Sequence, residues 1–258
     1  MSAAAESLVG YVLHTRPYRE SAALCELFTR ERGRMSVVAH GARGRKGAPS
    51  LLAFNRLSLQ LAGRGELKTL RKAETLEHRW LEGTALAAGL HLNELLVRLL
   101  PREDPHDGLF ATYAETLAAL EGAGLARALR RFERTLLDEL GYGVPLDLDH
   151  AGNAIDPARS YRLEPAQGFV ADSAGAFAGA TLLAILADAD DDPEIARVAR
   201  RLFNALLAPH LDGRPLRSRA LLGGARHGAA VLADHGGRAV APAATGGSEE
   251  PHGPPARG

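Results

Sequence analysis

The spacing of apolar residues changes once along the chain, close to Trp80, and this change limits the folds that the chain can adopt. Before Trp80, apolar residues come in short runs, and at 57–61 they alternate strictly with polar residues. This alternation predicts a strand with Leu57, Leu59 and Leu61 on its buried face. After Trp80, apolar residues follow helical spacing. We therefore expect an α+β protein in which the strands precede the helices.

Five short strands are predicted within the first 72 residues. Arg16-Pro17 and a charged turn that ends at Gly33 close the first two strands, and Gly63 and Gly65 turn the chain before the last. The predicted strands cover 8–15, 22–29, 35–40, 57–61 and 66–72. Five strands in so short a segment favour a small, partly closed barrel of the oligonucleotide-binding (OB) type.

The second part of the chain is predicted to be a helical bundle. Its first helix carries four leucines on one face and ends at Pro101, because proline does not continue a helix. Those leucines are Leu92, Leu95, Leu96 and Leu99. Two more helices follow, with apolar stripes that begin at Phe110 and Leu125. Later helices are expected at 177–186, 193–207 and 215–222.

These patterns divide the chain into domains. Residues 1–78 are expected to form the OB domain and residues 79–235 the helical domain, which ends in a small C-terminal region. The helical domain contains an irregular insertion at about 145–175, in which 160–163 and 168–171 could pair as a hairpin. Residues 236–258 are rich in Gly, Pro and Ala, so we expect a disordered tail there.

The two parts carry opposite charge, although the whole chain has 31 basic and 31 acidic side chains. Residues 1–72 hold 13 basic and 5 acidic side chains, a net charge of +8. Residues 73–258 hold 18 basic and 26 acidic ones, a net charge of −8. Such asymmetry points to a polyanionic partner for the first part. The alternative is that these charges only solvate a surface.

Basic residues gather where an OB barrel binds nucleic acid, across its second and third strands and near two of its loops. Cations near these loops, in the flexible segment 41–47 and on the last strand are expected to contact phosphates. They are Arg16, Arg19, Arg43, Arg45, Lys46, Arg64, Lys68, Arg71 and Lys72. Aromatic residues are few in this part of the chain, so backbone electrostatics should dominate over base stacking.

The third predicted helix carries a basic stripe beside its apolar one. The arginines of this stripe are Arg127, Arg130, Arg131 and Arg134. One interpretation is a docking site for an acidic, apolar-ended peptide, held by Arg127, Arg130 and Arg131. The other is a solvated helix face whose arginines pair with Glu133 and Asp138.

Motifs of enzymes and metal sites are weak in this sequence. It contains no Gly-x-Ser-x-Gly, no Walker phosphate loop and no His-Glu-x-x-His. Four aspartates precede Pro193 and favour a helix N-cap over a cation site: Asp188, Asp190, Asp191 and Asp192. The single cysteine, Cys25, suits a reducing cytosol. We expect no catalysis, no metal, no cofactor and no membrane span.

Four segments, in this order, resemble the bacterial RecO family of recombination mediators. They are 63–71 (GRGELKTLR), 92–96 (LNELL), 128–133 (ALRRFE) together with 140–143 (LGYG), and 213–219 (GRPLRSR). The likeness extends from about residue 11 to residue 222, which is nearly all of the chain that is expected to fold.

The resemblance implies an N-terminal OB barrel, a helical bundle and a small C-terminal region. It implies binding of single- and double-stranded DNA, strand annealing, and loading of the recombinase RecA onto gaps coated by single-strand-binding protein (SSB). RecR and the acidic C-terminal tail of SSB are the implied partners, and the family's tail contact falls on Arg130. It also implies a cytoplasmic, nucleoid-associated protein. Some members bind zinc through four cysteines after Gly-Tyr-Gly, and this chain has none there.

Two other classes of function stay open. A metal-dependent nuclease or hydrolase would use the aspartates from Asp188 to Asp192, and its divalent-dependent turnover would be lost on mutating Asp190 and Asp191. A protein-interaction scaffold would bind an acidic protein through its barrel and would not bind DNA at physiological salt. The mediator hypothesis instead predicts a DNA affinity that falls steeply with salt.

Overall fold

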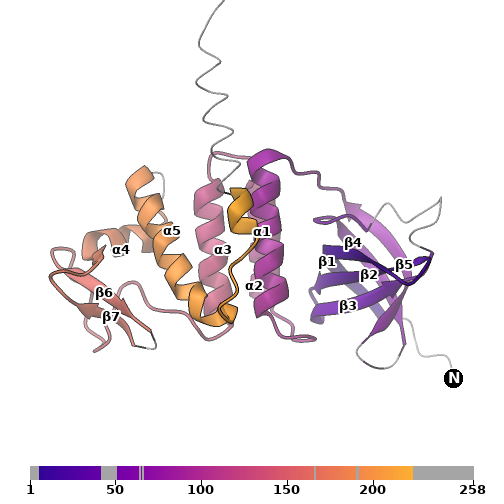
Figure 1. The fold of residues 1–258 in the computed structure, drawn as a ribbon, viewed down its shortest axis with the longest axis horizontal. Coiled ribbons are helices and arrows are strands. Elements are labelled where there is room, and N and C mark those ends of the chain that lie inside the picture. Colours follow the sequence, from indigo (N-terminus) through magenta and orange to yellow (C-terminus); the bar gives the residue numbers. More distant parts are fainter. Residues whose placement is uncertain are drawn as a thin grey trace, which may run out of the picture.

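The computed structural model describes residues 6–41, 51–63, 65, 67–165, 167–189 and 192–222. A β-barrel lies at one end of the molecule, a helical body follows it, and a small sheet lies at the other end (Figure 1). From the barrel to the small sheet the elements follow chain order, and α5 (Pro193–Leu207) then returns to lie between the sheet and α3 (Leu125–Glu139) (Figure 1). The barrel and the helices confirm the predicted α+β class.

The barrel is closed by five strands in the order β1-β2-β3-β5-β4. Neighbours are antiparallel, except for a short parallel contact between β3 and β5. The strands are β1 (Glu6–Tyr18), β2 (Ala22–Thr29), β3 (Gly33–Ala39), β4 (Arg56–Ala62) and β5 (Lys68–Glu77). The five predicted strands and the OB-type barrel are confirmed, but β5 continues to Glu77 and does not end at 72. After residue 72, exposed Glu74 and Leu76 alternate with half-buried Ala73, Thr75 and Glu77.

The interior of the barrel is filled by alternate residues of each strand, as the pleat requires. Leu57, Leu59 and Leu61 are buried there, as predicted, against side chains such as Val37 and Met35. The pairing of β1 with β2 shifts between Val12 and His14, and a bulge of this kind bends the strand. Tyr11, Leu13 and Phe28 belong to the core of the helical body instead.

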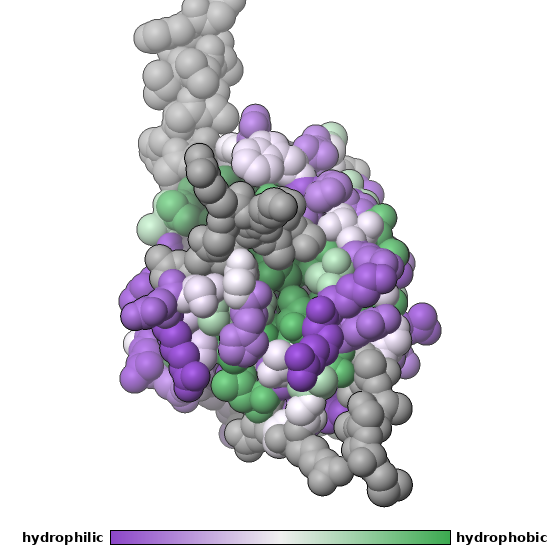
Figure 2. Space-filling view, turned by 90° about the vertical axis from the view of Figure 1, so that its right-hand side faces the viewer, coloured by the Kyte–Doolittle hydropathy of each residue, from purple (hydrophilic) through white to green (hydrophobic). Residues whose placement is uncertain are grey.

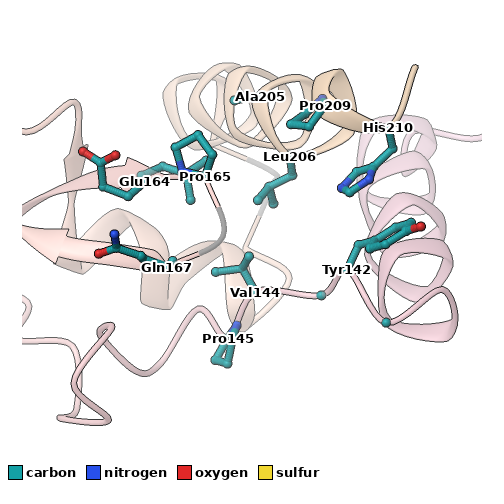
Figure 3. Close-up of a pocket in the computed structure, with 14 residues that line it drawn as sticks. Tyr142, Val144, Pro145, Glu164, Pro165, Gln167, Ala205, Leu206, Pro209 and His210 are labelled. Carbon is teal, nitrogen blue, oxygen red and sulfur yellow. The ribbon is translucent and has the colours of Figure 1, made fainter. Parts of the chain in front are cut away.

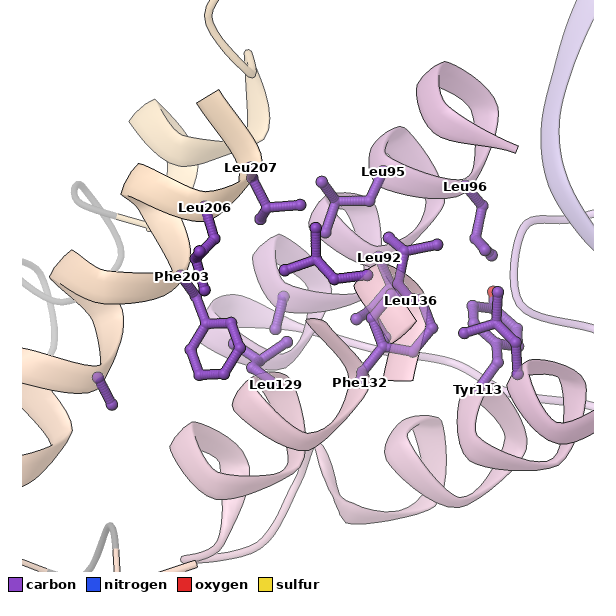
Figure 4. Close-up of a cluster of buried hydrophobic side chains, with 14 of the residues drawn as sticks. Leu92, Leu95, Leu96, Tyr113, Leu129, Phe132, Leu136, Phe203, Leu206 and Leu207 are labelled. Atoms are coloured by element: carbon purple, nitrogen blue, oxygen red, sulfur yellow. The ribbon is translucent and has the colours of Figure 1, made fainter. Parts of the chain in front are cut away.

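The helical body contains α1 (Gly83–Leu99), α2 (Asp107–Ala119), α3 (Leu125–Glu139), α4 (Gly179–Leu186), α5 (Pro193–Leu207) and the 3₁₀ helix η1 (Ala208–Leu211). Leucines of α1 meet Phe132 and Leu136 of α3 and Leu206 and Leu207 of α5 in one buried cluster (Figure 4). The leucine stripe that predicted α1 is therefore the face that packs on α3 and α5.

A three-stranded sheet completes the fold, in the order β7-β6-β8. The predicted hairpin is confirmed as β6 (Ser160–Glu164) and β7 (Gly168–Ala171). The helix predicted at 177–186 begins two residues late, because β8 (Phe177–Ala178) pairs with β6. The helix predicted at 215–222 begins only at 218. The predicted tail, 236–258, lies outside the described residues.

The barrel meets the helical body along β3. Arg34 accepts a backbone hydrogen bond from Glu103 at 2.9 Å, and its guanidinium donates to the carbonyl of Leu100 at 2.9 Å. At Gly33 the contact is so close that a Cβ atom would lie 1.8 Å from the carbonyl oxygen of Asp104. Only glycine fits this position, since its φ of +63° is also disfavoured for other residues.

Replacing Gly33 by alanine tests this contact, with Gly41→Ala as the matched control. Gly41 has a similar φ of +69°, but a Cβ there meets no described atom within 4 Å. Both changes should lower the free energy of unfolding by about 1–2 kcal/mol because of the left-handed backbone. Gly33→Ala should add roughly 1–3 kcal/mol for the clash. Urea titrations measure both losses, and equal losses would contradict the close approach.

Candidate functional site

The face at the free end of the barrel crosses four strands. Arg16 on β1 pairs with Leu24 on β2, Leu24 pairs with Val38 on β3, and Val38 pairs with Thr69 on β5. Paired residues share a face of the sheet. Leu24 and Val38 form a small apolar cluster with Ala22 outside the main barrel core. This end of the molecule shows hydrophobic residues near its centre, flanked by hydrophilic ones (Figure 2).

Five of the predicted DNA-binding residues belong to this end and are described. Arg16, Lys68 and Arg71 form no ion pair with any other described residue. The guanidinium of Arg19 lies 5.2 Å from the ring centroid of Tyr18. Lys72 pairs with Glu74 at 2.5 Å, although both side chains are more than half exposed. We call these five residues, Arg16, Arg19, Lys68, Arg71 and Lys72, the cationic face. By strand pairing Arg16 lies beside Leu24, whereas Lys68 pairs with Val37 of the barrel interior and Lys72 with Gln60 of β4.

The other four predicted DNA-binding residues, Arg43, Arg45, Lys46 and Arg64, lie outside the described part of the chain. Their contribution to the cationic face stays a prediction.

Three arginines that contribute to the charge of the first segment join the barrel to the helical body instead. Arg30 pairs with Asp107 at 3.4 Å. Arg32 pairs with Glu103 at 2.6 Å. Arg34 pairs with Glu26 of the barrel at 3.4 Å and reaches the helical body through its hydrogen bond to the carbonyl of Leu100. Burial lowers the pKa of Arg34, and the charge of Arg102 acts in the same direction. The charge excess in the sequence is therefore divided between an interdomain contact and the free end of the barrel.

The three arginines predicted to form one peptide site do not lie together. Arg131 is exposed on α3 and pairs with Glu115 of α2 at 3.6 Å. Arg127 is half-buried and has a partner of its own. Arg130 is only 9% exposed, and its guanidinium lies 5.9 Å from the ring centroid of Phe203 on α5. The pair with Glu133 that the sequence suggested does form, at 2.5 Å, but it is buried rather than solvated.

Arg130 lines a pocket of about 430 Å³ between α1, α3, α5 and the end of the described chain. We call it the arginine pocket, after its five arginines: Arg130, Arg197, Arg200, Arg201 and Arg219. Leu129 and Leu222 supply apolar lining, and Glu133 is the one carboxylate among the lining residues. The site can therefore accept an anion that also carries an apolar group.

Sequence reasoning missed four of these five arginines. Arg197, Arg200 and Arg201 lie at i, i+3 and i+4 on α5, a spacing that places them on one helix face. From this spacing alone, a basic face on α5 could have been predicted from the sequence. Arg219 could not have been linked to them, since it follows a turn and reaches the pocket only through the tertiary fold.

A buried polar network forms one wall of the arginine pocket. His91 of α1 is 2% exposed, and its Nε2 lies 3.0 Å from Oε1 of Glu133. The Nδ1 atom of the same ring lies 3.1 Å from Oγ of Ser218. Glu133 thus contacts His91 through one oxygen and Arg130 through the other. This network fixes the position of Arg130.

A second cavity, of about 570 Å³, lies on another side of α5. It is enclosed by the segment 141–145, the β6–β7 turn, α5 and η1, and Val144 and Leu206 point into it (Figure 3). At one end the rings of Tyr142 and His210 stack with centroids 3.7 Å apart. Its lining is mostly apolar and contains no lysine or arginine, so it does not match the anion chemistry of the arginine pocket.

The aspartates before α5 divide between different roles. Asp192 is the N-cap of α5 and accepts a hydrogen bond from the backbone N–H of Glu194 at 2.8 Å. Pro193 follows it in the first helical turn, where proline is favoured. Asp188 lies 3.4 Å from Arg134. Asp190 and Asp191 lie outside the described residues. Among the residues that are described, no group of three or more His, Cys, Asp or Glu side chains is placed to hold a metal ion.

None of the helices described is long and apolar enough to cross a bilayer.

Comparison with known proteins gives a consistent result over both parts of the chain. The family model "Recombination protein O N terminal" matches residues 3–79, and "Recombination protein O C terminal" matches residues 81–220. The DNA repair protein RecO of Stutzerimonas stutzeri (strain A1501) is 50% identical over 217 residues, which cover 82% of this chain and 91% of that protein.

Other relatives of the same name agree. RecO of Pseudomonas paraeruginosa (strain DSM 24068 / PA7) is 48% identical over 217 residues, covering 82% of this chain and 92% of that protein. RecO of Methylococcus capsulatus (strain ATCC 33009 / NCIMB 11132 / Bath) is 45% identical over 225 residues, with coverages of 82% and 90%. With a barrel and a helical body that each match a family model, this chain belongs to the RecO family of DNA repair proteins.

Proposed function

We propose that this protein is a recombination mediator that binds single- and double-stranded DNA and acts without catalysis. It anneals complementary strands and, together with RecR, helps to load RecA onto gaps coated by SSB. The observation that carries this proposal is the cationic face, where Arg16, Lys68 and Arg71 form no ion pair with other described residues. Membership of the RecO family supports the partners.

Exposed cations on a strand surface suit the binding of nucleic acid of any base sequence. Phosphate contacts by lysine and arginine release counterions and carry no base information. The apolar residues between the cations, Leu24 and Val38, are only 8% and 6% exposed and offer little surface for stacking bases. Tyr18, half-buried beside Arg19, is the one described aromatic in this cluster. Binding is therefore proposed to depend mainly on the DNA backbone.

The arginine pocket is proposed to bind the acidic C-terminal tail of SSB. Five arginines and only one carboxylate are among its lining residues, so the lining carries excess positive charge. Its apolar residues Leu129 and Leu222 can receive an apolar chain end. Of the three tail-binding residues predicted from the sequence, Arg130 lines this pocket. Arg127 and Arg131 do not line it, so their role in tail binding stays a separate, testable proposal.

The competing proposal of a metal-dependent nuclease has less support. Asp192 is engaged as a helix cap and Asp188 pairs with Arg134, so two of its four aspartates already have structural partners. Turnover of DNA that requires a divalent cation and is lost on mutating Asp190 and Asp191 would favour it over the mediator.

The main test is the annealing of complementary strands coated with SSB, measured with and without the protein across a salt series. The protein should accelerate annealing at low salt, and the acceleration should fall as salt rises because phosphate contacts weaken. An annealing rate that the protein does not change at any salt concentration would refute the mediator proposal.

The cationic face is tested by replacing Arg16, Lys68 and Arg71 together by alanine. On single-stranded DNA, the loss of three phosphate contacts should make the slope of log K against log salt shallower by about 2. Affinity should fall alike for unrelated sequences, since no base contact is lost. Fluorescence anisotropy with labelled oligonucleotides measures both quantities.

Arg30→Ala is the control for that triple change, because Arg30 is an exposed barrel arginine that pairs with Asp107 of the helical body. It should leave the salt slope unchanged. A slope that responds to Arg30 and not to the triple change would place the DNA elsewhere on the barrel.

The tail site is tested by Arg200→Ala. Arg200 lines the arginine pocket from an exposed position on α5, so its removal leaves the buried pair of Arg130 and Glu133 intact. Binding of a labelled peptide copy of the SSB tail should weaken about three- to tenfold, as for one partly screened ionic contact, and DNA binding should not change. Arg131→Ala, on the face of α3 toward Glu115, is the comparison. Weakening by Arg131→Ala alone would move the tail site to that face.

A further inference from the structure

The end of the described chain is held against α1 by one carboxylate. Glu94 accepts hydrogen bonds from the backbone N–H groups of Arg217 and Ser218, both at 2.9 Å, and from Oγ of Ser218 at 2.7 Å. A carboxylate at the first N–H groups of a helix is a stabilising arrangement. Burial acts to raise the pKa of Glu94, but the hydrogen bonds from Ser218 and Arg217 outweigh it, and the net pKa is lowered. Glu94 therefore carries its charge and holds the start of this helix at neutral pH.

Arg219 directly follows Ser218, so the hydrogen bonds from Arg217 and Ser218 to Glu94 also determine where Arg219 lies. Arg219 lines the arginine pocket, and its Nε and Nη2 atoms are shielded from solvent without a hydrogen-bond partner among the described residues. Burial lowers the pKa of Arg219, while the charges of Glu133 and Glu94 act in the opposite direction. A buried N–H group without an acceptor is costly and needs an explanation.

The neighbouring carboxylates do not supply that acceptor. Oε1 of Glu133 lies 3.0 Å from Nε2 of His91. Oε2 of Glu133 pairs with the charge of Arg130 at 2.5 Å but, like the Arg219 atoms, has no hydrogen-bond partner among the described residues. Glu94 contacts the backbone of Arg217 through one oxygen and Ser218 through the other. The two N–H groups of Arg219 thus lie in a pocket lined by five arginines, where both oxygens of Glu94 and Oε1 of Glu133 are hydrogen-bonded to other groups and Oε2 of Glu133 is paired with Arg130.

Nε–H and Nη2–H lie along one edge of the guanidinium plane. This edge binds a carboxylate through two parallel hydrogen bonds, which is the strongest and most directional contact that arginine makes. We propose that Arg219 receives a carboxylate of the bound acidic peptide through this edge, and that Glu94 is the positioning residue that holds Arg219 in place. The inference rests on the proposed function of the arginine pocket and names the residue that gives it directional recognition.

A peptide carboxylate fits this place better than a DNA phosphate. The pocket is concave, has a volume of about 430 Å³ and includes Leu129 and Leu222, so it suits the end of a peptide chain rather than a continuous sugar-phosphate backbone. Binding of phosphate at Arg219 is an outcome that the experiment distinguishes.

The test is Arg219→Lys in the full-length protein, with Arg217→Lys as the matched control. Lysine keeps the positive charge but has no pair of parallel donors. Arg217 is exposed in the same turn and does not line the pocket. Affinity for a labelled synthetic peptide that copies the SSB tail should fall about ten- to a hundredfold for Arg219→Lys, and it should not change for Arg217→Lys. Affinity for a labelled oligonucleotide should be the same in all three proteins.

Thermal melting separates recognition from folding. Because two N–H groups of the Arg219 guanidinium have no acceptor among the described residues, lysine should not lower the melting temperature. Saturating peptide should raise the melting temperature of the unmutated protein more than that of the Arg219→Lys variant.

Two further outcomes overturn the inference in different ways. Equal peptide affinity for the unmutated protein and Arg219→Lys would refute the role of Arg219 while leaving the tail site in place. A peptide that fails to bind the unmutated protein would refute both the inference and the proposed tail site. A parallel loss of oligonucleotide affinity in Arg219→Lys would assign Arg219 to phosphate instead.

Discussion

The contact between the barrel and the helical body determines where both candidate sites lie. Tyr11 and Phe28, on the outside of the barrel, pack against Phe110 and Tyr113 of α2 with ring centroids 5.1–5.9 Å apart. Large apolar side chains on an outer face must be covered, so this side of the barrel is committed to the helices. Asn93 strengthens the contact, because it donates to the carbonyl of Leu13 at 2.8 Å and accepts from the hydroxyl of Tyr113 at 2.6 Å.

This docking divides the positive charge of the first segment. Cations beside the contact, such as Arg30 and Arg32, pair with carboxylates of the helical body and stabilise the junction. The cationic face lies at the end of the barrel away from the helices, whereas α5, which carries three arginines of the pocket, lies beyond α3 on the other side of the bundle (Figure 1). The two proposed sites therefore share no residue.

The sequence predicted local features better than tertiary ones. The alternation of Leu57, Leu59 and Leu61 predicted a strand face, and Asp192 before Pro193 predicted a helix cap, because both depend on spacing within a few residues. The ion pair of Arg32 with Glu103 joins residues 71 positions apart, and charge counts cannot reveal it. The arginine pocket draws on α1, α3, α5 and the short helix that begins at residue 218, so its composition emerged only when the chain was folded.

Burial explains how one residue type can serve two kinds of recognition in this chain. Arg16 and Arg71 are exposed, so their contacts with an anion would be screened by water and salt and would depend little on geometry. Arg130 is held by its pair with Glu133, and Nε and Nη2 of Arg219 are shielded from solvent, so both arginines have a smaller effective dielectric around their donors. Exposed arginines therefore favour a long polyanion in any register, and arginines shielded from solvent favour a short anionic group in one orientation.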